Sequence, residues 1–187
     1  TLVRYNEQEF GLLKKWIVCP QYWDIKDSTW KSRPIRLKNI QSGPGFGMMS
    51  SMNDLVKYSN ALDQNTLIAK EQYTKITTPF YTESPYGMGW FVTDFEGVKM
   101  DWAYGYGDYD ASILLKIPSE RLSLIVLSTS SLLSQSTRLG FGNPLNSPLI
   151  CSFLRNFVNK KSENFDQKLA VEESFSQAVV QLFAPSG

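Results

Sequence analysis

Between residues 88 and 128 the sequence carries four strand-like segments that are separated by short turns. These segments span residues 88–95, 98–104, 111–117 and 122–128. Glu96-Gly97 supplies a two-residue hairpin turn, and Pro118-Ser-Glu-Arg121 supplies a second tight connection. Sequential strands with such short connections pair as an antiparallel meander. The run Leu122-Ser-Leu-Ile-Val-Leu127 is apolar enough to predict a central strand that is buried on both faces.

Helical patterns flank these strands. A helix is expected over residues 7–18, with an apolar face made by Phe10, Leu13, Trp16 and Ile17. Ser51 is a good N-cap for a second helix, since Asp54 follows three residues later. The apolar face of that helix would hold Leu55, Tyr58 and Leu62. Further helices are expected over residues 69–76, 149–158 and 166–183, whereas residues 20–47 and 130–148 read as loops.

The order of these elements predicts an α+β fold, in which helices pack on an antiparallel β-sheet. A chain of 187 residues with 42% hydrophobic residues can form one substantial core. We therefore expect residues 1–187 to form a single domain. No run of about 18 apolar residues occurs, so no membrane-spanning helix is expected.

The composition excludes several kinds of chemistry. The chain has no histidine, so a Ser-His-Asp triad and a His-ligated metal site are both excluded. Its net charge is +1 and its basic residues form no stripe, so nucleic acid is not an expected partner. Cys19 and Cys151 are far apart, and we expect free, buried thiols rather than a zinc site or a disulfide framework. Asp108 and Asp110 lack the spacing of a calcium loop. No metal and no cofactor is predicted.

Five segments occur in an order that resembles the second half of a β-lactamase-related serine hydrolase. They are residues 45–62, Thr77-Thr-Pro79, Tyr86-Gly-Met-Gly-Trp90, Trp102-Ala-Tyr-Gly105 and Leu114-Leu-Lys-Ile-Pro118. This family includes class C β-lactamases, D-Ala-D-Ala carboxypeptidases of the penicillin-binding type and related esterases. The resemblance covers roughly residues 5–158. It implies a β-lactamase/transpeptidase-like fold that is incomplete in this chain, a small-molecule or peptide substrate, and a periplasmic or secreted location.

The family's serine belongs to a Ser-x-x-Lys motif, whose lysine helps to deprotonate it. One literal match is Ser28-Thr-Trp-Lys31, but it stands in a polar loop, whereas the family's serine begins a buried helix. The literal Tyr-x-Asn match, Tyr58-Ser-Asn60, falls inside an ordinary helix. We reject both as catalytic motifs.

Tyr5-Asn-Glu7 is the better match to the family's tyrosine motif, because a helix of similar pattern follows it. Glu7 stands where the family has asparagine. On this match Tyr5 is the catalytic tyrosine, and the Ser-x-x-Lys lies upstream of the chain. The chain is then the C-terminal part of a β-lactamase-like domain, and the N-terminal part of the same domain is its expected partner. The alternative is that Tyr5 is simply a partly buried aromatic residue.

The family's third motif, Lys-Thr-Gly or His-x-Gly, aligns with Ala103-Tyr104-Gly105. Ala103 removes the cationic or hydrogen-bonding group that is usual at the first position. Gly105 would let a substrate backbone approach the strand, and the N–H of Tyr106 would serve as one oxyanion donor. Two alternatives stay open. The segment is a strand-end aromatic turn without catalytic meaning, or Tyr104, Tyr106 and Tyr109 form a stacking wall for a ligand.

Three functions follow for the full-length protein. The first is hydrolysis of an amide, β-lactam or ester through an acyl-serine, for which this chain alone would be inactive. The second is an inactive relative that binds peptide or cell-wall ligands, as Ala103 and Glu7 suggest. The third is an unrelated α+β interaction module. That third reading requires that the four strand-like segments do not share one antiparallel sheet.

Overall fold

The computed structural model describes residues 14–33, 47–107, 110–130, 139–159 and 162–182, with the single positions 8, 11, 12, 45, 133 and 137. For residues 175–182 it describes the backbone alone. The α-helices in this part of the chain are α2 (Met52–Asp63), α3 (Lys70–Ile76), α5 (Pro148–Phe157) and α6 (Phe165–Leu182). The strands are β1 (Gln21–Asp24), β2 (Thr29–Ser32), β3 (Phe91–Phe95), β4 (Val98–Tyr106), β5 (Ala111–Ile117) and β6 (Leu122–Ser128).

Strands β3 to β6 form one antiparallel sheet in chain order, which confirms the predicted meander and the α+β class. β5 and β6 have the expected bounds, whereas β3 begins at Phe91 and β4 continues to Tyr106. The β3–β4 hairpin turns at Glu96 and Gly97, whose φ angles are 53° and 81°. Two consecutive positive φ values match the twist of the flanking strands, which explains why a Gly is needed in this turn.

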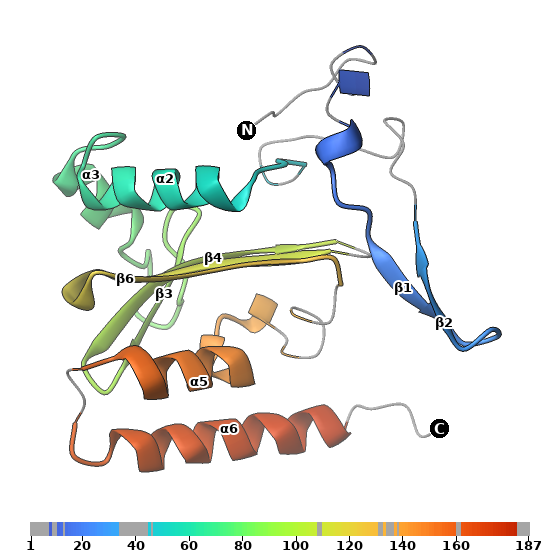
Figure 1. Ribbon diagram of the computed structural model, residues 1–187. Coiled ribbons are helices and arrows are strands. Elements are labelled where there is room, and N and C mark those ends of the chain that lie inside the picture. The colour runs from blue at the N-terminus through green and yellow to red at the C-terminus, as the bar shows by residue number, and fades with distance from the viewer. Residues whose placement is uncertain are drawn as a thin grey trace.

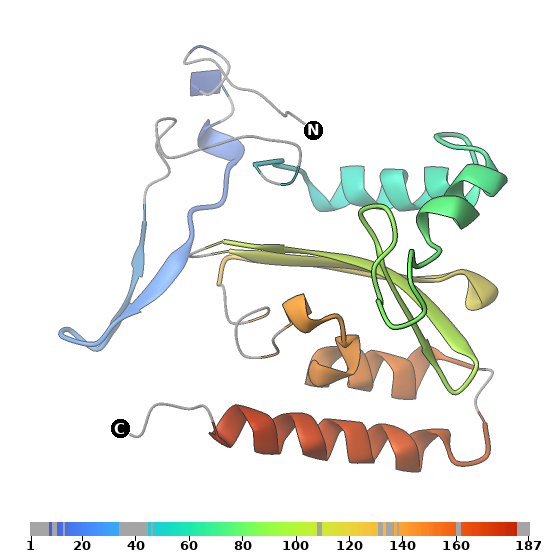
Figure 2. The same cartoon turned by 180° about the vertical axis from the view of Figure 1, so that it is seen from behind.

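The sheet lies between two layers of helices. α2 and α3 cover one face, and α5 and α6 cover the other (Figure 1). The view from behind shows the same layers (Figure 2). An apolar core fills the space between the sheet and the α5–α6 layer. Its fully buried members include Met100, Trp102, Leu115, Ile117, Leu139, Ile150, Cys151, Leu154 and Leu169.

The second helix begins as predicted. The Ser51 hydroxyl accepts a hydrogen bond from the Asp54 N–H at 3.1 Å and so caps α2. The predicted apolar face is right in part: Leu62 is buried and Leu55 is half-buried, but Tyr58 is 41% exposed. The face that meets the sheet also carries a buried Ser59, which the apolar pattern did not predict.

Residues 20–47 are not all loop. β1 and β2 form an antiparallel hairpin, so the prediction is wrong for residues 21–24 and 29–32. Trp23 and Trp30 face each other across it, with ring centroids 5.6 Å apart. The hairpin projects away from the helical layers (Figures 1 and 2). The Gln21 N–H joins its base to the sheet by donating to the Thr129 carbonyl at 3.2 Å.

β6 is not the central strand that its apolar run predicts. Within the described residues it pairs with β5 alone, so it is an edge of the sheet, and most of its residues are half-buried. β4 and β5 hold the central positions. An apolar run indicates that both faces of a strand are covered, but it does not indicate that both edges are paired.

The N-terminal helix expected over residues 7–18 is described only in part. Lys14–Trp16 forms a 3₁₀-helix, and Trp16 is 75% exposed rather than turned to a core. Phe10 and Leu13 lie outside the described residues. The loop expected over residues 130–148 contains two short 3₁₀-helices, Leu139–Phe141 and Pro144–Asn146. None of the helices described is both long and apolar enough to cross a membrane.

Candidate functional site

The end of β4 extends beyond its neighbour β3. The β3–β4 register begins with Phe91 opposite Trp102, so within the sheet residues 103–106 pair with β5 only. Side chains alternate between the two faces of a strand. Ala103 and Gly105 therefore lie on the face toward α2, whereas Tyr104 and Tyr106 lie on the face toward α5. The four candidate substrate-binding residues are contiguous, but their side chains do not share one surface.

Local packing explains why residue 105 is a glycine. It lies directly opposite Ser112 on β5. A Cβ at position 105 would lie 2.4 Å from the Ser112 Oγ, well inside contact distance. The glycine keeps this part of the sheet surface free of side-chain atoms at the end of β4.

Tyr104 does not take part in the ligand-stacking wall that was one alternative for the three tyrosines. Its ring centroid lies 5.9 Å from that of Phe91 and 6.0 Å from that of Trp102, so it extends the aromatic core. A Cβ on Gly140 would lie 2.8 Å from the Tyr104 hydroxyl, so the 3₁₀-helix Leu139–Phe141 approaches this side chain closely. Tyr106 is 58% exposed at the strand end. Tyr109 lies outside the described residues.

Tyr5 and Glu7, the predicted tyrosine motif, also lie outside the described residues. The two rejected motifs are described. Ser28 sits in the β1–β2 turn with φ 51°. The Lys31 ammonium donates to Asp24 at 2.7 Å and to Asp27, and these hydrogen bonds raise the pKa of Lys31. A lysine held in its charged form cannot act as a base toward Ser28, which supports the rejection.

A buried polar cluster joins α2 to the sheet, and the sequence analysis missed it. The Lys116 side chain, 1% exposed, donates from Nζ to the Ser59 Oγ at 2.7 Å and to the Ser59 carbonyl at 3.2 Å. Nζ also donates to the Ser123 Oγ at 3.2 Å and pairs with the Asp63 Oδ1 at 2.9 Å. The Ser59 and Ser123 hydroxyls lie 2.9 Å apart.

This cluster brings a serine hydroxyl and a lysine ammonium to the distance of a nucleophile and its base. Burial and charge argue against that use. Ser59 is 2% exposed, so no substrate carbonyl reaches it. The Lys116 ammonium is also held by the Asp63 carboxylate at 2.9 Å and by the hydroxyls of Ser59 and Ser123. The cluster therefore anchors α2 on the sheet rather than performing chemistry.

Asp101 continues the polar face on β4. The Tyr73 hydroxyl donates to its Oδ2 at 3.3 Å, and the Lys99 ammonium lies 3.5 Å from its Oδ1. Oδ1 is buried and accepts no hydrogen bond within the described part of the chain. Burial raises the pKa of Asp101, although Lys99 and Tyr73 oppose this shift. Burial and the neighbouring Asp101 also raise the pKa of Tyr73.

One signal for these residues was present in the sequence. Lys116 interrupts an apolar strand, between Leu115 and Ile117. A charged residue inside a buried strand requires a partner of opposite charge. The partner, Asp63, could not be identified because pairing depends on how α2 packs across the sheet.

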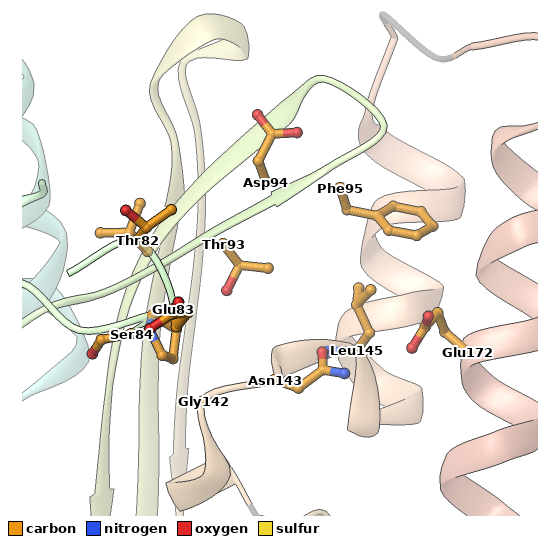
Figure 3. Close-up of a pocket in the computed structure, with 12 residues that line it drawn as sticks. Thr82, Glu83, Ser84, Thr93, Asp94, Phe95, Gly142, Asn143, Leu145 and Glu172 are labelled. Carbon is orange, nitrogen blue, oxygen red and sulfur yellow. The ribbon is translucent and has the colours of Figure 1, made fainter. Parts of the chain in front are cut away.

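An open cavity of about 390 Å³ lies elsewhere, between the 82–85 segment, β3, the 142–145 segment and α6. Figure 3 shows Glu83, Asp94 and Glu172 around it. Among the residues that the structure describes, no lysine or arginine lines the cavity. Within the described residues, no group of three or more His, Cys, Asp or Glu side chains could hold a metal ion.

Comparisons with known proteins give one distant likeness. No protein-family model matches the chain, and no curated protein matches it. A solved structure that is similar is the octameric penicillin-binding protein homologue from Pyrococcus abyssi, with 20% sequence identity and a TM-score of 0.45. The match covers 65% of this chain and 30% of that one. The match thus spans less than a third of that protein. The likeness assigns neither an activity nor a substrate to the present chain.

Proposed function

We propose that the chain contributes the substrate-facing sheet and its covering helices to a β-lactamase-related serine hydrolase. The reaction is acyl transfer to water through an acyl-serine, on a β-lactam, amide or ester. The observation that carries the proposal is the strand arrangement. The four strands implied by the resemblance share one antiparallel sheet in chain order, and the segment matching the third motif ends β4 beyond the limit of β3. Had these strands belonged to different sheets, the resemblance would have been false.

The backbone directions at the end of β4 fit an oxyanion role. Phe95 and Val98 close the two-residue hairpin, so even-numbered residues of β4 point their N–H groups toward β3 and odd-numbered ones toward β5. The Gly107 N–H, which donates to the Asp110 carbonyl at 3.0 Å, follows the same alternation. The Tyr106 N–H therefore points to the side where β3 has ended. In the proposed site, the substrate carbonyl lies on that side of the strand.

Gly105 suits a strand that a substrate backbone approaches closely. It presents no Cβ toward the α2 side, and its neighbour Ser112 offers a hydroxyl on the same face. An extended peptide or an acyl-amide could lie along such a strand end by main-chain contacts. Ala103 adds a small apolar side chain there, in place of a cationic group.

The nucleophile in this proposal comes from outside the described residues. Ser28 is followed three residues later by the ion-paired Lys31, and Ser59 is buried on the face of α2 that meets the sheet. Neither serine combines access to substrate with a lysine that is free of a carboxylate partner. The Ser-x-x-Lys and the catalytic tyrosine, for which Tyr5 is the candidate, would complete the site as the N-terminal part of the same domain.

A covalent probe tests the proposal on the full-length protein. It is incubated with a fluorophosphonate and, separately, with a labelled penicillin, and the modified peptide is located by mass spectrometry. The expected result is one adduct, on the serine of a Ser-x-x-Lys motif. Heat-denatured protein is the control and should carry none. Absence of an adduct on any serine of the native protein would contradict the hydrolase proposal.

A second candidate is a relative that binds the same ligands without turnover. It is favoured by Ala103, because the missing cationic group would normally hold a substrate carboxylate. Calorimetry with a D-Ala-D-Ala peptide distinguishes the two candidates. Saturable binding with neither an adduct nor product supports the inactive relative, and product formation excludes it.

A further inference from the structure

Two glycines at the end of β4 each lie beneath an oxygen atom from the neighbouring strand. Gly105 pairs in register with Ser112, and the Gly107 N–H donates to the Asp110 carbonyl at 3.0 Å, so Gly107 lies opposite Asp110. A Cβ on Gly105 would overlap the Ser112 Oγ, and a Cβ on Gly107 would overlap the Asp110 Oδ1. Both polar side chains therefore lean across onto β4. They occupy the space that side chains at positions 105 and 107 would fill.

These oxygen atoms lie on the face of the sheet that α2 covers. Lys116 identifies this face, because its Nζ donates to the Ser59 Oγ of α2 at 2.7 Å. Side chains an even number of positions apart lie on the same face of a strand. Ser112 and Asp110 are four and six positions from Lys116, so they share its face. The odd-numbered residues of the 103–107 segment face the same side through their pairing with β5.

Asp110 gives the strand end a negative charge. Among the residues of β4, β5 and their connection that lie on the α2 face there, Asp110 alone is charged, and these residues are Ala103, Gly105, Gly107, Asp110, Ser112 and Leu114. The lysine on the same face of β5 is Lys116, about 20 Å further along the strand. Its ammonium is paired with Asp63 at 2.9 Å. The charge on Asp110 is therefore the one that a ligand at the strand end meets from this part of the sheet.

The carboxylate lies next to the proposed oxyanion donor. Tyr106 stands between the two glycines, and its N–H faces the substrate carbonyl in the proposed site. The Asp110 Oδ1 covers Gly107, whose Cα is about 3.8 Å from that of Tyr106 across one peptide bond. At physiological ionic strength, charges interact over about 8 Å. A charged group close to the substrate carbonyl is therefore within range of this carboxylate.

The two leaning oxygen atoms differ in what they can bind. An ionised carboxylate only accepts hydrogen bonds, whereas a serine hydroxyl both donates and accepts them. The pair formed by Asp110 and Ser112 therefore suits a substrate N–H or cationic group and opposes a substrate carboxylate. A repulsive contact of this kind separates substrates that share the same reactive carbonyl.

We propose that Asp110 selects the substrate of this site by charge. Acyl groups that are neutral or cationic near the carbonyl are accepted, and those that carry a carboxylate there react more slowly. Within the reaction proposed above, this favours uncharged or cationic esters and amides over penicillins and peptides that end in a free carboxylate. The inference rests on the proposed hydrolase function and adds a substrate class to it.

Labelling rates with three matched probes test the inference on the full-length protein. The probes are alkyl fluorophosphonates of equal chain length, and their chains end in a methyl group, a carboxylate or a trimethylammonium group. Each reacts in the same way, since the serine oxygen bonds to phosphorus and fluoride leaves. The protein should react about three- to tenfold more slowly with the anionic probe than with the neutral one. The cationic probe should react at least as fast as the neutral one.

Asp110→Asn should bring the rates for the anionic and neutral probes close together, because it removes the charge and keeps a side chain of the same size. Asp94→Asn is the matched control. Asp94 is an exposed carboxylate on β3 that pairs in register with Lys99, near the start of β4, so the ratio of the two rates should stay unchanged. Raising the ionic strength from about 0.01 M to about 1 M should reduce the wild-type ratio, since the Debye length falls from about 30 Å to about 3 Å. Circular dichroism checks that both variants fold.

The inference and the hydrolase function fail in different ways. No adduct with any of the three probes would overturn the hydrolase function, and this inference with it. Adducts that form equally fast with all three probes, or fastest with the anionic one, would overturn the role of Asp110 alone. A preference against the anionic probe that Asp110→Asn leaves unchanged would do the same.

Discussion

The Lys116 ammonium at the centre of the sheet lies 2.9 Å from the Asp63 Oδ1 at the end of α2. The two residues come from adjacent layers of the molecule, the sheet and the α2 layer. Ser59 and Ser123 complete the coordination of the ammonium, so the buried charge is fully hydrogen-bonded. The contribution of this ion pair to stability is therefore best measured by removing one partner and determining the loss in the free energy of unfolding.

Asp63→Asn should lower the free energy of unfolding by about 1–3 kcal/mol, because it removes the carboxylate that pairs with the buried Lys116 ammonium at 2.9 Å. The lower half of that range is expected, since the Asp63 side chain is 39% exposed and water screens the pair. Glu96→Gln, which removes the carboxylate from the more exposed Lys168 pair, is the control and should cost less than about 1 kcal/mol. Urea denaturation measures both. An equal loss for the two variants would contradict a special role for Lys116.

Gly87→Ala should destabilise the protein by about 1–3 kcal/mol. A Cβ at this position would lie 2.3 Å from the Ile76 carbonyl oxygen, a backbone atom that cannot turn aside. The same region is fixed by the Met88 N–H, which donates to that carbonyl at 2.9 Å. Gly45→Ala is the matched control, because its Cβ would meet nothing within 4 Å. Thermal melts that shift equally for both variants would show that the close approach is unimportant.

The two cysteines should react at very different rates. Cys151 is buried in the core, and burial raises the pKa of its thiol to about 11, so the reactive thiolate is scarce at neutral pH. Cys19 is only half-buried, and neither residue forms a disulfide. Ellman's reagent should label one thiol quickly in the native protein and two after denaturation. A Cys19→Ser variant that still labels quickly would show that Cys151 is accessible.

Local signals predicted the main sheet well. The β3–β4 turn and the bounds of β5 and β6 followed from turn residues and apolar segments, which depend on nearby sequence. The β1–β2 hairpin was missed because its strands have four residues each and bury little, so no alternation marks them. Its Trp23–Trp30 contact exists only once the strands have paired.

Long-range contacts were the part that the sequence could not supply. Ser59 and Lys116 are 57 positions apart, and their hydrogen bond depends on where α2 lies on the sheet. Asp63 is the last residue of α2, and its carboxylate pairs with Lys116. Of the candidate site, the existence of the strand was predicted correctly, but the predicted end at Tyr104 left out Gly105 and Tyr106. The division of their side chains between two faces was not foreseen, although strand alternation implies it.

Asp101 should make stability fall as pH rises above the acidic range. Burial raises the pKa of its carboxyl above the ordinary value of 3.8, so the folded protein holds this proton more tightly than the unfolded chain. That contribution is complete below the unfolded pKa and is lost as pH rises through the folded pKa. Asp101→Asn cannot ionise and escapes the loss. Its free energy of unfolding relative to wild type should therefore increase between about pH 4 and pH 7. Urea melts across this range measure the difference, and a constant or decreasing difference would show that Lys99 and Tyr73 outweigh burial.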